Sequence, residues 1–280
     1  MNQRELYAEI DWLLQEVAGL DRLALHLEMF KDRAQIQLAQ SLSELTQLWQ
    51  RRLDERVPVQ YLVGVVPWRN FSLTVSPAVL IPRPETEYLV DLAVKAVQQH
   101  PYRFLELAQG DWTDLGTGSG AIALGLATVF PAAFIHAVDC SLAALAIAQQ
   151  NAQNLGLDSQ IQFYQGFWLE PLHSLKGRLS GIVANPPYIP TKMLTELQPE
   201  VAWHEPHLAL DGGIDGLDCI RQIIATASGY LQSAGILLLE IMAGQASSVK
   251  QLLQQQGNYR DIQIHLDLAG IERFVLAYRV

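Results

Sequence analysis

Cysteine, long apolar runs and positive charge are all scarce in this 280-residue chain. Its 2 cysteines, Cys140 and Cys219, cannot build a disulfide framework or a thiolate zinc site, which fits a reducing compartment. No segment approaches the roughly 20 apolar residues that cross a bilayer. The first 20 residues interleave acidic with apolar side chains and lack the basic leader of a secretory signal. We therefore expect a soluble, cytoplasmic protein with no membrane partner.

The charged residues are unevenly distributed along the chain. Lys and Arg total 19 against 29 Asp and Glu, and residues 85–280 alone hold 10 basic and 19 acidic side chains. This negative excess repels phosphate backbones and disfavours bulk nucleic acid as a partner, although net charge alone leaves a nucleic-acid enzyme open. Half of the chain is hydrophobic, which predicts at least one well-filled core.

Glycine and proline are nearly absent from residues 1–56, where apolar residues such as Leu6 and Leu13 recur with helical period. Gly19 and Asp21 interrupt that period, so we predict a small bundle of short helices. The segment holds no cluster of reactive side chains. It is either a structural cap or a docking module for a macromolecular partner, and the pattern leaves both open.

Residues 57–84 are rich in proline, and Phe71 and Leu73 alternate with polar residues. Alternation at period two predicts a strand, paired as a β-hairpin with a segment around residues 62–66. The prolines make this segment a stiff connector. We therefore predict three parts: a helical domain over 1–56, a linker over 57–84 and a third domain over 85–280.

From residue 85 onward, strand and helix patterns alternate, which predicts an α/β fold with a mostly parallel sheet covered on both faces. Only a short loop containing Gly270 separates the last two strands, so these must be antiparallel neighbours. The seven predicted strands lie at 112–115, 134–138, 161–164, 181–184, 236–239, 262–266 and 274–278.

A glycine loop follows the first of these strands. It reads Asp114-Leu115-Gly116-Thr117-Gly118-Ser119-Gly120 and directly precedes a helical pattern. Such a loop brings backbone amides close to a ligand at a helix N-terminus. Asp139, 25 residues after Asp114, ends the next strand and can accept both ribose hydroxyls of an adenosine. Together they predict a nucleotide-like cofactor.

The spacing of the loop distinguishes between cofactors. Dinucleotide binders use G-x-G-x-x-G, whereas this loop reads G-x-G-x-G and begins with the acid Asp114. A carboxylate favours a ligand that carries an ammonium and a sulfonium over a pyrophosphate. We therefore favour S-adenosylmethionine, with a nicotinamide cofactor as the remote alternative.

Asn185-Pro186-Pro187-Tyr188 follows the fourth predicted strand, at the same edge of the sheet as the glycine loop. The Asn185 side-chain oxygen and the Pro186 carbonyl can accept both hydrogens of a planar NH2 group, while Tyr188 offers a flat face. Carbonyl dipoles around the nitrogen stabilise the positive charge that develops as it is methylated. The element therefore predicts amide or amine methylation.

Two acidic or histidine-containing stretches do not predict a metal site. His204, Glu205 and His207 lack the H-E-x-x-H spacing of zinc helices. The Asp211-Gly212-Gly213 segment lacks the spacing and the closing Glu of a calcium loop, and we expect a turn there. We predict no metal cofactor.

The sequence resembles the HemK/PrmC family of protein-(glutamine-N5) methyltransferases. The resemblance spans almost the whole chain, and its most specific motif is the Ile-Pro-Arg-Pro-Glu-Thr-Glu connector. Its elements are Gln60-Tyr61-Leu62 with Gly64, residues 81–87, residues 114–120, residues 185–188, residues 205–216 and Glu272-Arg273-Phe274.

That resemblance implies a class I S-adenosylmethionine-dependent methyltransferase with a Rossmann-like fold. Its sheet is seven-stranded and mostly parallel with an antiparallel terminal strand, and a small N-terminal helical domain and a hairpin linker precede it. The implied substrate is the glutamine of the Gly-Gly-Gln motif in class 1 peptide chain release factors, with S-adenosylhomocysteine as the second product. Direct nucleic-acid binding is not expected.

The resemblance also assigns roles by position. Asp114 and the loop residues Gly116, Thr117, Gly118, Ser119 and Gly120 are implied to bind the cofactor, together with Asp139 at the ribose, Trp168 beside the adenine, and Asn185. Asn185, Pro186, Pro187 and Tyr188 are implied to hold the glutamine amide, with Asn185, Pro186 and Tyr188 as the catalytic set. Many relatives carry an acid where this chain has Phe167, so the contact to the adenine amino group is not assigned.

Two other functions remain open on these motifs. Asn-Pro-Pro-Tyr also occurs in enzymes that methylate adenine N6 or guanine N2 in nucleic acid, but such an enzyme predicts a basic groove, and residues 85–280 contain no Lys/Arg cluster. A scaffold that binds S-adenosylmethionine without catalysis is the other alternative. Intact Asn185 and Tyr188 argue against it.

Overall fold

The computed structural model describes residues 3–32 and 35–280. Chain contacts divide it into two compact units. The first runs to Val65 and includes Gln198–His204, and the second comprises Val66–Leu197 and Glu205–Val280. Among these described residues, no helix combines the length and the apolar character needed to span a membrane.

The first unit is helical, as its apolar period predicts. Asp21 caps α2 by accepting the backbone N–H of Ala24 at 2.9 Å, and Ser41 with Glu44 forms a capping box at α3. Leu13 and Leu45 are buried in its core. Its elements are α1 (Gln3–Glu16), α2 (Arg22–His26), η1 (Met29–Asp32), α3 (Leu42–Asp54), α4 (Val59–Val63) and α9 (Pro199–His204).

The predicted hairpin is present, but its first strand begins later than expected. It consists of β1 (Val65–Trp68) and β2 (Phe71–Thr74). The prediction of strand at Leu62 and Val63 is wrong, because both belong to α4. Gly64 ends that helix with φ of 81°, a left-handed conformation that glycine adopts without strain.

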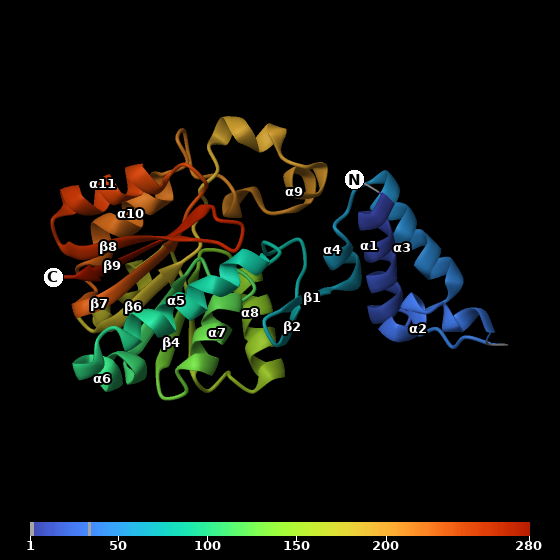
Figure 1. Ribbon diagram of the computed structural model, residues 1–280, viewed down its shortest axis with the longest axis horizontal. Helices are drawn as coiled ribbons and strands as arrows, with labels where there is room; N and C mark the ends of the chain where they lie inside the picture. Colours follow the sequence, from blue (N-terminus) through green and yellow to red (C-terminus); the bar gives the residue numbers. More distant parts are fainter. Residues whose placement is uncertain (1–2, 33–34) are drawn as a thin grey trace. The chain divides into compact units, whose positions relative to one another are not determined.

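The second unit is built on a seven-stranded sheet in the order β5-β4-β3-β6-β7-β9-β8, drawn in Figure 1. The first five of these are parallel, and β9 is antiparallel to both β7 and β8, which confirms the predicted fold. The strands are β3 (Asp111–Leu115), β4 (Phe134–Asp139), β5 (Ile161–Gln165), β6 (Leu179–Ala184), β7 (Leu231–Glu240), β8 (Tyr259–Leu266) and β9 (Glu272–Arg279).

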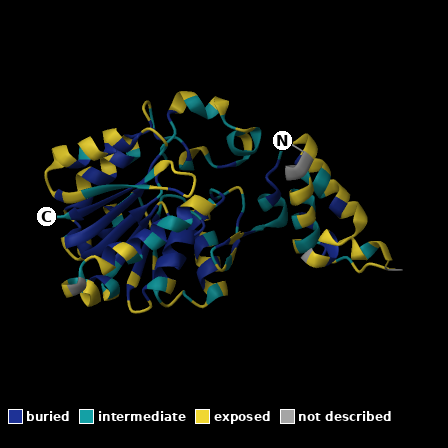
Figure 2. Cartoon of the chain, viewed as in Figure 1, coloured by how far each residue is buried: buried dark blue, intermediate teal, exposed yellow. Residues whose placement is uncertain are grey.

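Helices cover both faces of this sheet. Figure 1 shows α5 (Glu87–Gln98), α7 (Ala121–Val129) and α8 (Leu142–Leu155) on one face and α10 (Asp218–Ala227) and α11 (Ala246–Gln256) on the other. The central strands between them are buried (Figure 2). Short elements complete the unit: α6 (Phe104–Gln109), η2 (Pro84–Thr86), η3 (Pro101–Arg103), η4 (Glu170–Leu175), η5 (Thr191–Glu196) and η6 (His207–Ala209).

The register of the sheet determines where the functional loops meet. Leu115 of β3 lies opposite Val138 of β4 and Ala184 of β6. All three strands are parallel, so the segments that follow them leave the same edge of the sheet. Asp139 and Asn185 therefore flank the glycine loop from its two sides.

Candidate active site

The glycine loop makes a tight turn between β3 and α7. Gly116 and Gly118 have φ of 74° and 55°, and the backbone N–H groups of Gly116 and Thr117 both donate to the Val138 carbonyl at 2.9 Å. A Cβ on Gly120 would lie 3.2 Å from the Cβ of Ala148, so α7 packs closely against α8. The glycines thus serve both the turn and the close packing.

Asp114 stabilises the glycine loop through hydrogen bonds to its buried side chain. It is fully buried, and its Oδ2 accepts the Thr117 hydroxyl at 2.6 Å and the Ala123 N–H at 3.0 Å. Burial raises the pKa of this carboxyl to about 7, despite these two hydrogen bonds, which lower it. Asp114 therefore ties the loop to the start of α7.

Asp139 ends β4 beside the loop, with its two carboxylate oxygens held by backbone groups. Oδ2 accepts the N–H of Gly118 and Oδ1 accepts the N–H of Ser141, each at 2.9 Å. These bonds fix the orientation of the carboxylate, which lines a cavity of about 380 Å³.

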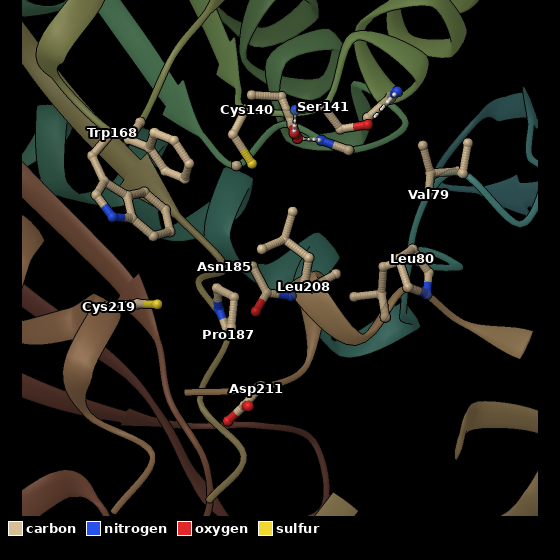
Figure 3. A pocket seen from close by; sticks show the side chains of 18 of the residues that line it. Val79, Leu80, Cys140, Ser141, Trp168, Asn185, Pro187, Leu208, Asp211 and Cys219 are labelled. Carbon is tan, nitrogen blue, oxygen red and sulfur yellow. Dashed lines mark hydrogen bonds between the residues drawn. The ribbon is translucent and has the colours of Figure 1, made fainter. Parts of the chain in front are cut away.

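That cavity collects residues from all three strand ends (Figure 3). Six residues with a predicted function line it: Gly116, Gly118, Asp139, Trp168, Asn185 and Pro187. The other six do not line it: Asp114, Thr117, Ser119, Gly120, Pro186 and Tyr188. The structure thus places half of the predicted residues on the cavity wall and the rest outside it.

Several lining residues have no site role predicted from the sequence. Val79 and Leu80 come from the proline-rich connector, Leu208 from η6, and Cys219 and Gln222 from α10. Figure 3 shows Leu80 and Leu208 on the side of the cavity that Asn185 also borders. These are apolar or neutral residues without a motif, so no local signal marks them.

Trp168 is held in place by α10. Its indole Nε1 donates to Gln222 Oε1 at 2.9 Å, and its backbone has φ of 50°. A Cβ on Gly116 would lie 3.6 Å from the Trp168 ring, so the ring sits against the glycine loop. The neighbouring Phe167 also lines the cavity and is 57% exposed.

The Asn-Pro-Pro-Tyr element is connected by side chains to two residues far away in sequence. Asn185 Nδ2 donates to Thr86 Oγ1 at 3.2 Å, and Thr86 Oγ1 donates to Glu240 Oε2 at 2.7 Å. The Tyr188 hydroxyl donates to Glu240 Oε1 at 3.1 Å. Burial raises the pKa of Glu240 to about 7 and also raises the pKa of Tyr188.

The backbone of the same element is held by Gln245, at the N-terminus of α11, and by the glycine-containing segment that precedes α10. Gln245 Nε2 donates to the carbonyls of Tyr188, at 3.0 Å, and Gly216, at 3.2 Å. A Cβ on Gly212 would lie 2.8 Å from the Tyr188 Cα and 2.7 Å from the Gly216 carbonyl oxygen. Glycine is required because two backbone segments touch there. In the same segment Asp211 accepts the Gly213 N–H at 2.9 Å, which makes the predicted turn.

Both cysteines line the cavity, Cys140 directly after β4 and Cys219 from α10 (Figure 3). Both thiols are free. Burial raises the pKa of Cys140, and it raises the pKa of Cys219 to about 11. Both thiols are therefore protonated at neutral pH and line the wall as small, weakly polar groups.

These features fit S-adenosylmethionine. The wall combines glycine backbone in left-handed conformation, a fixed carboxylate and an indole, which suit an amino acid chain, a ribose and an adenine. Within the described parts of the chain, no lysine or arginine lines the cavity, so nothing there neutralises a pyrophosphate. The fold and this wall together define a class I methyltransferase.

Comparison with known proteins places the chain more narrowly. The model of the family described as "Methyltransferase small domain" matches residues 91–203. The release factor glutamine methyltransferase of Synechocystis sp. is 53% identical over 96% of this chain and 89% of its own length. That of Thermosynechococcus vestitus is 51% identical over 96% and 90%. The chain belongs to the family of release factor glutamine methyltransferases.

A solved structure supports the fold alone. The catalytic domain of hMettl16, in complex with a MAT2A 3′UTR hairpin, aligns with a TM-score of 0.59 at 13% identity, covering 84% of this chain and 80% of that chain. Identity this low carries no information about substrate.

Proposed function

We propose that this protein transfers a methyl group from S-adenosylmethionine to the side-chain N5 of the glutamine in the Gly-Gly-Gln motif of class 1 peptide chain release factors. The observation that carries the proposal is that Asp139, Trp168 and Asn185 all line one cavity. Membership of the family implies S-adenosylmethionine as methyl donor, and the wall described above is compatible with it.

In this proposal, one part of the cavity wall binds the cofactor and another part binds the substrate amide. Gly116 and Gly118 border the methionine part of the cofactor, the Asp139 carboxylate accepts the ribose hydroxyls, and Trp168 flanks the adenine. When bound, the cofactor supplies an electrophilic methyl group. Asp114 and Thr117 support the loop through the bonds of Asp114 to Thr117 and to the start of α7. The Ser119 carbonyl accepts Asn151 Nδ2 at 2.9 Å, and Gly120 lets α7 pack closely against Ala148.

The substrate amide is held by the Asn-Pro-Pro-Tyr element. Asn185 Oδ1 and the Pro186 carbonyl accept its two N–H groups, and Pro187 and Tyr188 keep that geometry rigid. An amide nitrogen is a weak nucleophile because its lone pair is delocalised. Fixed carbonyl dipoles stabilise the positive charge that develops on nitrogen, and the methylated nitrogen loses its proton afterwards.

A protein substrate needs contacts beyond the cavity. The first unit is a helical module without a reactive cluster in its described residues, and we assign to it a docking role for the release factor. The buried Arg52, paired with Glu9 at 2.7 Å and Glu200 at 2.9 Å, keeps α1, α3 and α9 together as one module.

The cytoplasmic location of the protein stays a prediction from the sequence.

The experiment is methylation of a purified release factor with methyl-labelled S-adenosylmethionine, beside the same factor with its Gly-Gly-Gln glutamine changed to alanine. We expect label only in the glutamine form, and Asn185→Ala to abolish it. Equal labelling of both factors would contradict the proposal. Labelling of nucleic acid in place of protein would instead support amino methylation of a base, which the acidic excess of residues 85–280 disfavours.

A further inference from the structure

A chain of side-chain hydrogen bonds runs from the cavity wall into the protein. It begins at Asn185, passes through the Thr86 hydroxyl to the Glu240 carboxylate, and returns to Tyr188. Thr86 lies in η2, and Glu240 is the last residue of β7. Both are buried, at 4% and 1% exposure. Neither lines the cavity.

The direction of each bond follows from the donor inventory. An ionised Glu240 carboxylate only accepts, so the Thr86 hydroxyl and the Tyr188 hydroxyl both donate to it. A threonine hydroxyl has one proton, and that proton is committed to Glu240. Thr86 can then only accept from Asn185, which turns the NH2 end of the Asn185 amide toward Thr86. The oxygen end is left for a ligand in the cavity.

We propose that Thr86 and Glu240 are positioning residues that fix the Asn185 amide so that its oxygen, and not its NH2 group, meets the substrate nitrogen. This inference rests on the proposed function. An amide in the opposite orientation would present a donor to the substrate NH2 group and repel it. The same carboxylate fixes the Tyr188 ring through its hydroxyl.

The charge of Glu240 is set by its surroundings. Thr86 and Tyr188 donate to it, Arg273 favours its ionised form, and Glu85 and burial oppose ionisation. When Glu240 takes up a proton, it becomes a donor to Thr86, whose hydroxyl can then donate to Asn185 and turn the amide over. The orientation is therefore correct only while Glu240 is ionised.

The first test compares Thr86→Val with Thr86→Ser. Valine keeps the shape and removes the hydroxyl, and we expect kcat to fall roughly 10- to 100-fold, because about one to two hydrogen bonds in the transition state are lost. Serine restores most of that rate. Affinity for S-adenosylhomocysteine, measured by calorimetry, stays within about threefold. Thr128→Val, on an exposed threonine of α7, is the matched control.

The second test uses pH and the isosteric Glu240→Gln. In the wild type, kcat rises with pH, with its midpoint near the Glu240 pKa of about 7, and levels off at higher pH, where Glu240 is fully ionised. The side chain introduced by Glu240→Gln cannot ionise. The kcat of this variant is therefore lower than that of the wild type and does not fall further as the pH is lowered. Equal pH profiles in the two proteins, or Thr86→Val as active as Thr86→Ser, would overturn the inference.

A third measurement needs no substrate. The side-chain NH2 resonances of Asn185, assigned by their loss in Asn185→Asp, should exchange slowly in the wild type and in Thr86→Ser and faster in Thr86→Val. Unchanged resonances in Thr86→Val would refute the orientation. If the wild type fails to label any release factor, the proposed function fails, and these resonances still decide the inference.

Discussion

Arg83 Nη2 lies 2.7 Å from both carboxylate oxygens of Glu205, whose side chain is 1% exposed. The pair joins the proline-rich connector to the segment that carries Leu208 and Asp211 onto the cavity wall. Burial raises the pKa of Glu205, and the Arg83 guanidinium offsets part of that rise. The ion pair therefore holds two cavity segments together at the cost of a buried charge.

We expect Arg83→Met to destabilise the protein by about 3 kcal/mol, because it leaves the Glu205 carboxylate buried without its partner. The loss grows with pH. The pKa of Glu205 is already raised in the folded state, and removing Arg83 raises it further, so stability falls as pH increases from the unfolded pKa to the folded one.

Urea unfolding at pH 5 and pH 8 measures this effect. The double variant Arg83→Met/Glu205→Gln removes the charge as well and should recover much of the stability at pH 8. If Arg83→Met lowers the free energy of unfolding equally at pH 5 and pH 8, the stabilising role given to the Arg83–Glu205 ion pair is contradicted.

Asp139→Asn should weaken binding of S-adenosylhomocysteine roughly 10- to 100-fold, since the amide replaces one acceptor with a donor next to the Gly118 or Ser141 N–H. Calorimetry measures the affinity. Asp158→Asn, an exposed acid in the same unit, is the control and should bind like the wild type. Unaltered affinity in Asp139→Asn would remove Asp139 from the cofactor site.

Gln222→Leu should reduce cofactor affinity by a factor of roughly 3 to 10, because Trp168 loses the acceptor for its indole N–H and its ring becomes mobile. Gln222→Glu keeps an acceptor oxygen and should bind more tightly than the leucine variant. Trp168 fluorescence, isolated by subtraction of a Trp168→Phe spectrum, reports the change in the ring environment. Equal affinity of the two Gln222 variants would show that the indole bond has no role.

Gly212→Ala should lower both stability, by about 1–3 kcal/mol, and kcat, because the new methyl would lie 2.8 Å from the Tyr188 Cα and must displace the Asn-Pro-Pro-Tyr element. Gly229→Ala is the matched control, since its Cβ would meet only the Thr226 carbonyl oxygen, at 3.4 Å. Thermal unfolding and single-turnover methylation separate the two effects. Full activity in Gly212→Ala would mean that the element does not need this support.

The sheet and its loops were predictable because their signals are local. The glycine loop, the acid that ends the next strand and the helices α7 and α8 depend on residues a few positions apart. The error at Leu62 and Val63 has a local cause as well. A short apolar run is compatible with either a strand or a helix, and here only the C-terminal cap at Gly64 indicates that the run is helical.

The sequence by itself determined the chemistry available at the site: a glycine loop with Asp139 for an adenosine and Asn185 with two prolines for a planar amide. Only the tertiary structure decided which residues hold the Asn185 amide and orient it toward the cavity. Thr86 is 99 residues from Asn185 and 154 from Glu240, and no periodicity links positions so far apart. Asn185 and Glu240 meet because β6 and β7 are parallel neighbours whose carboxyl ends lie at one edge of the sheet. Thr86 reaches the same edge from η2, where burial makes each hydrogen bond obligatory.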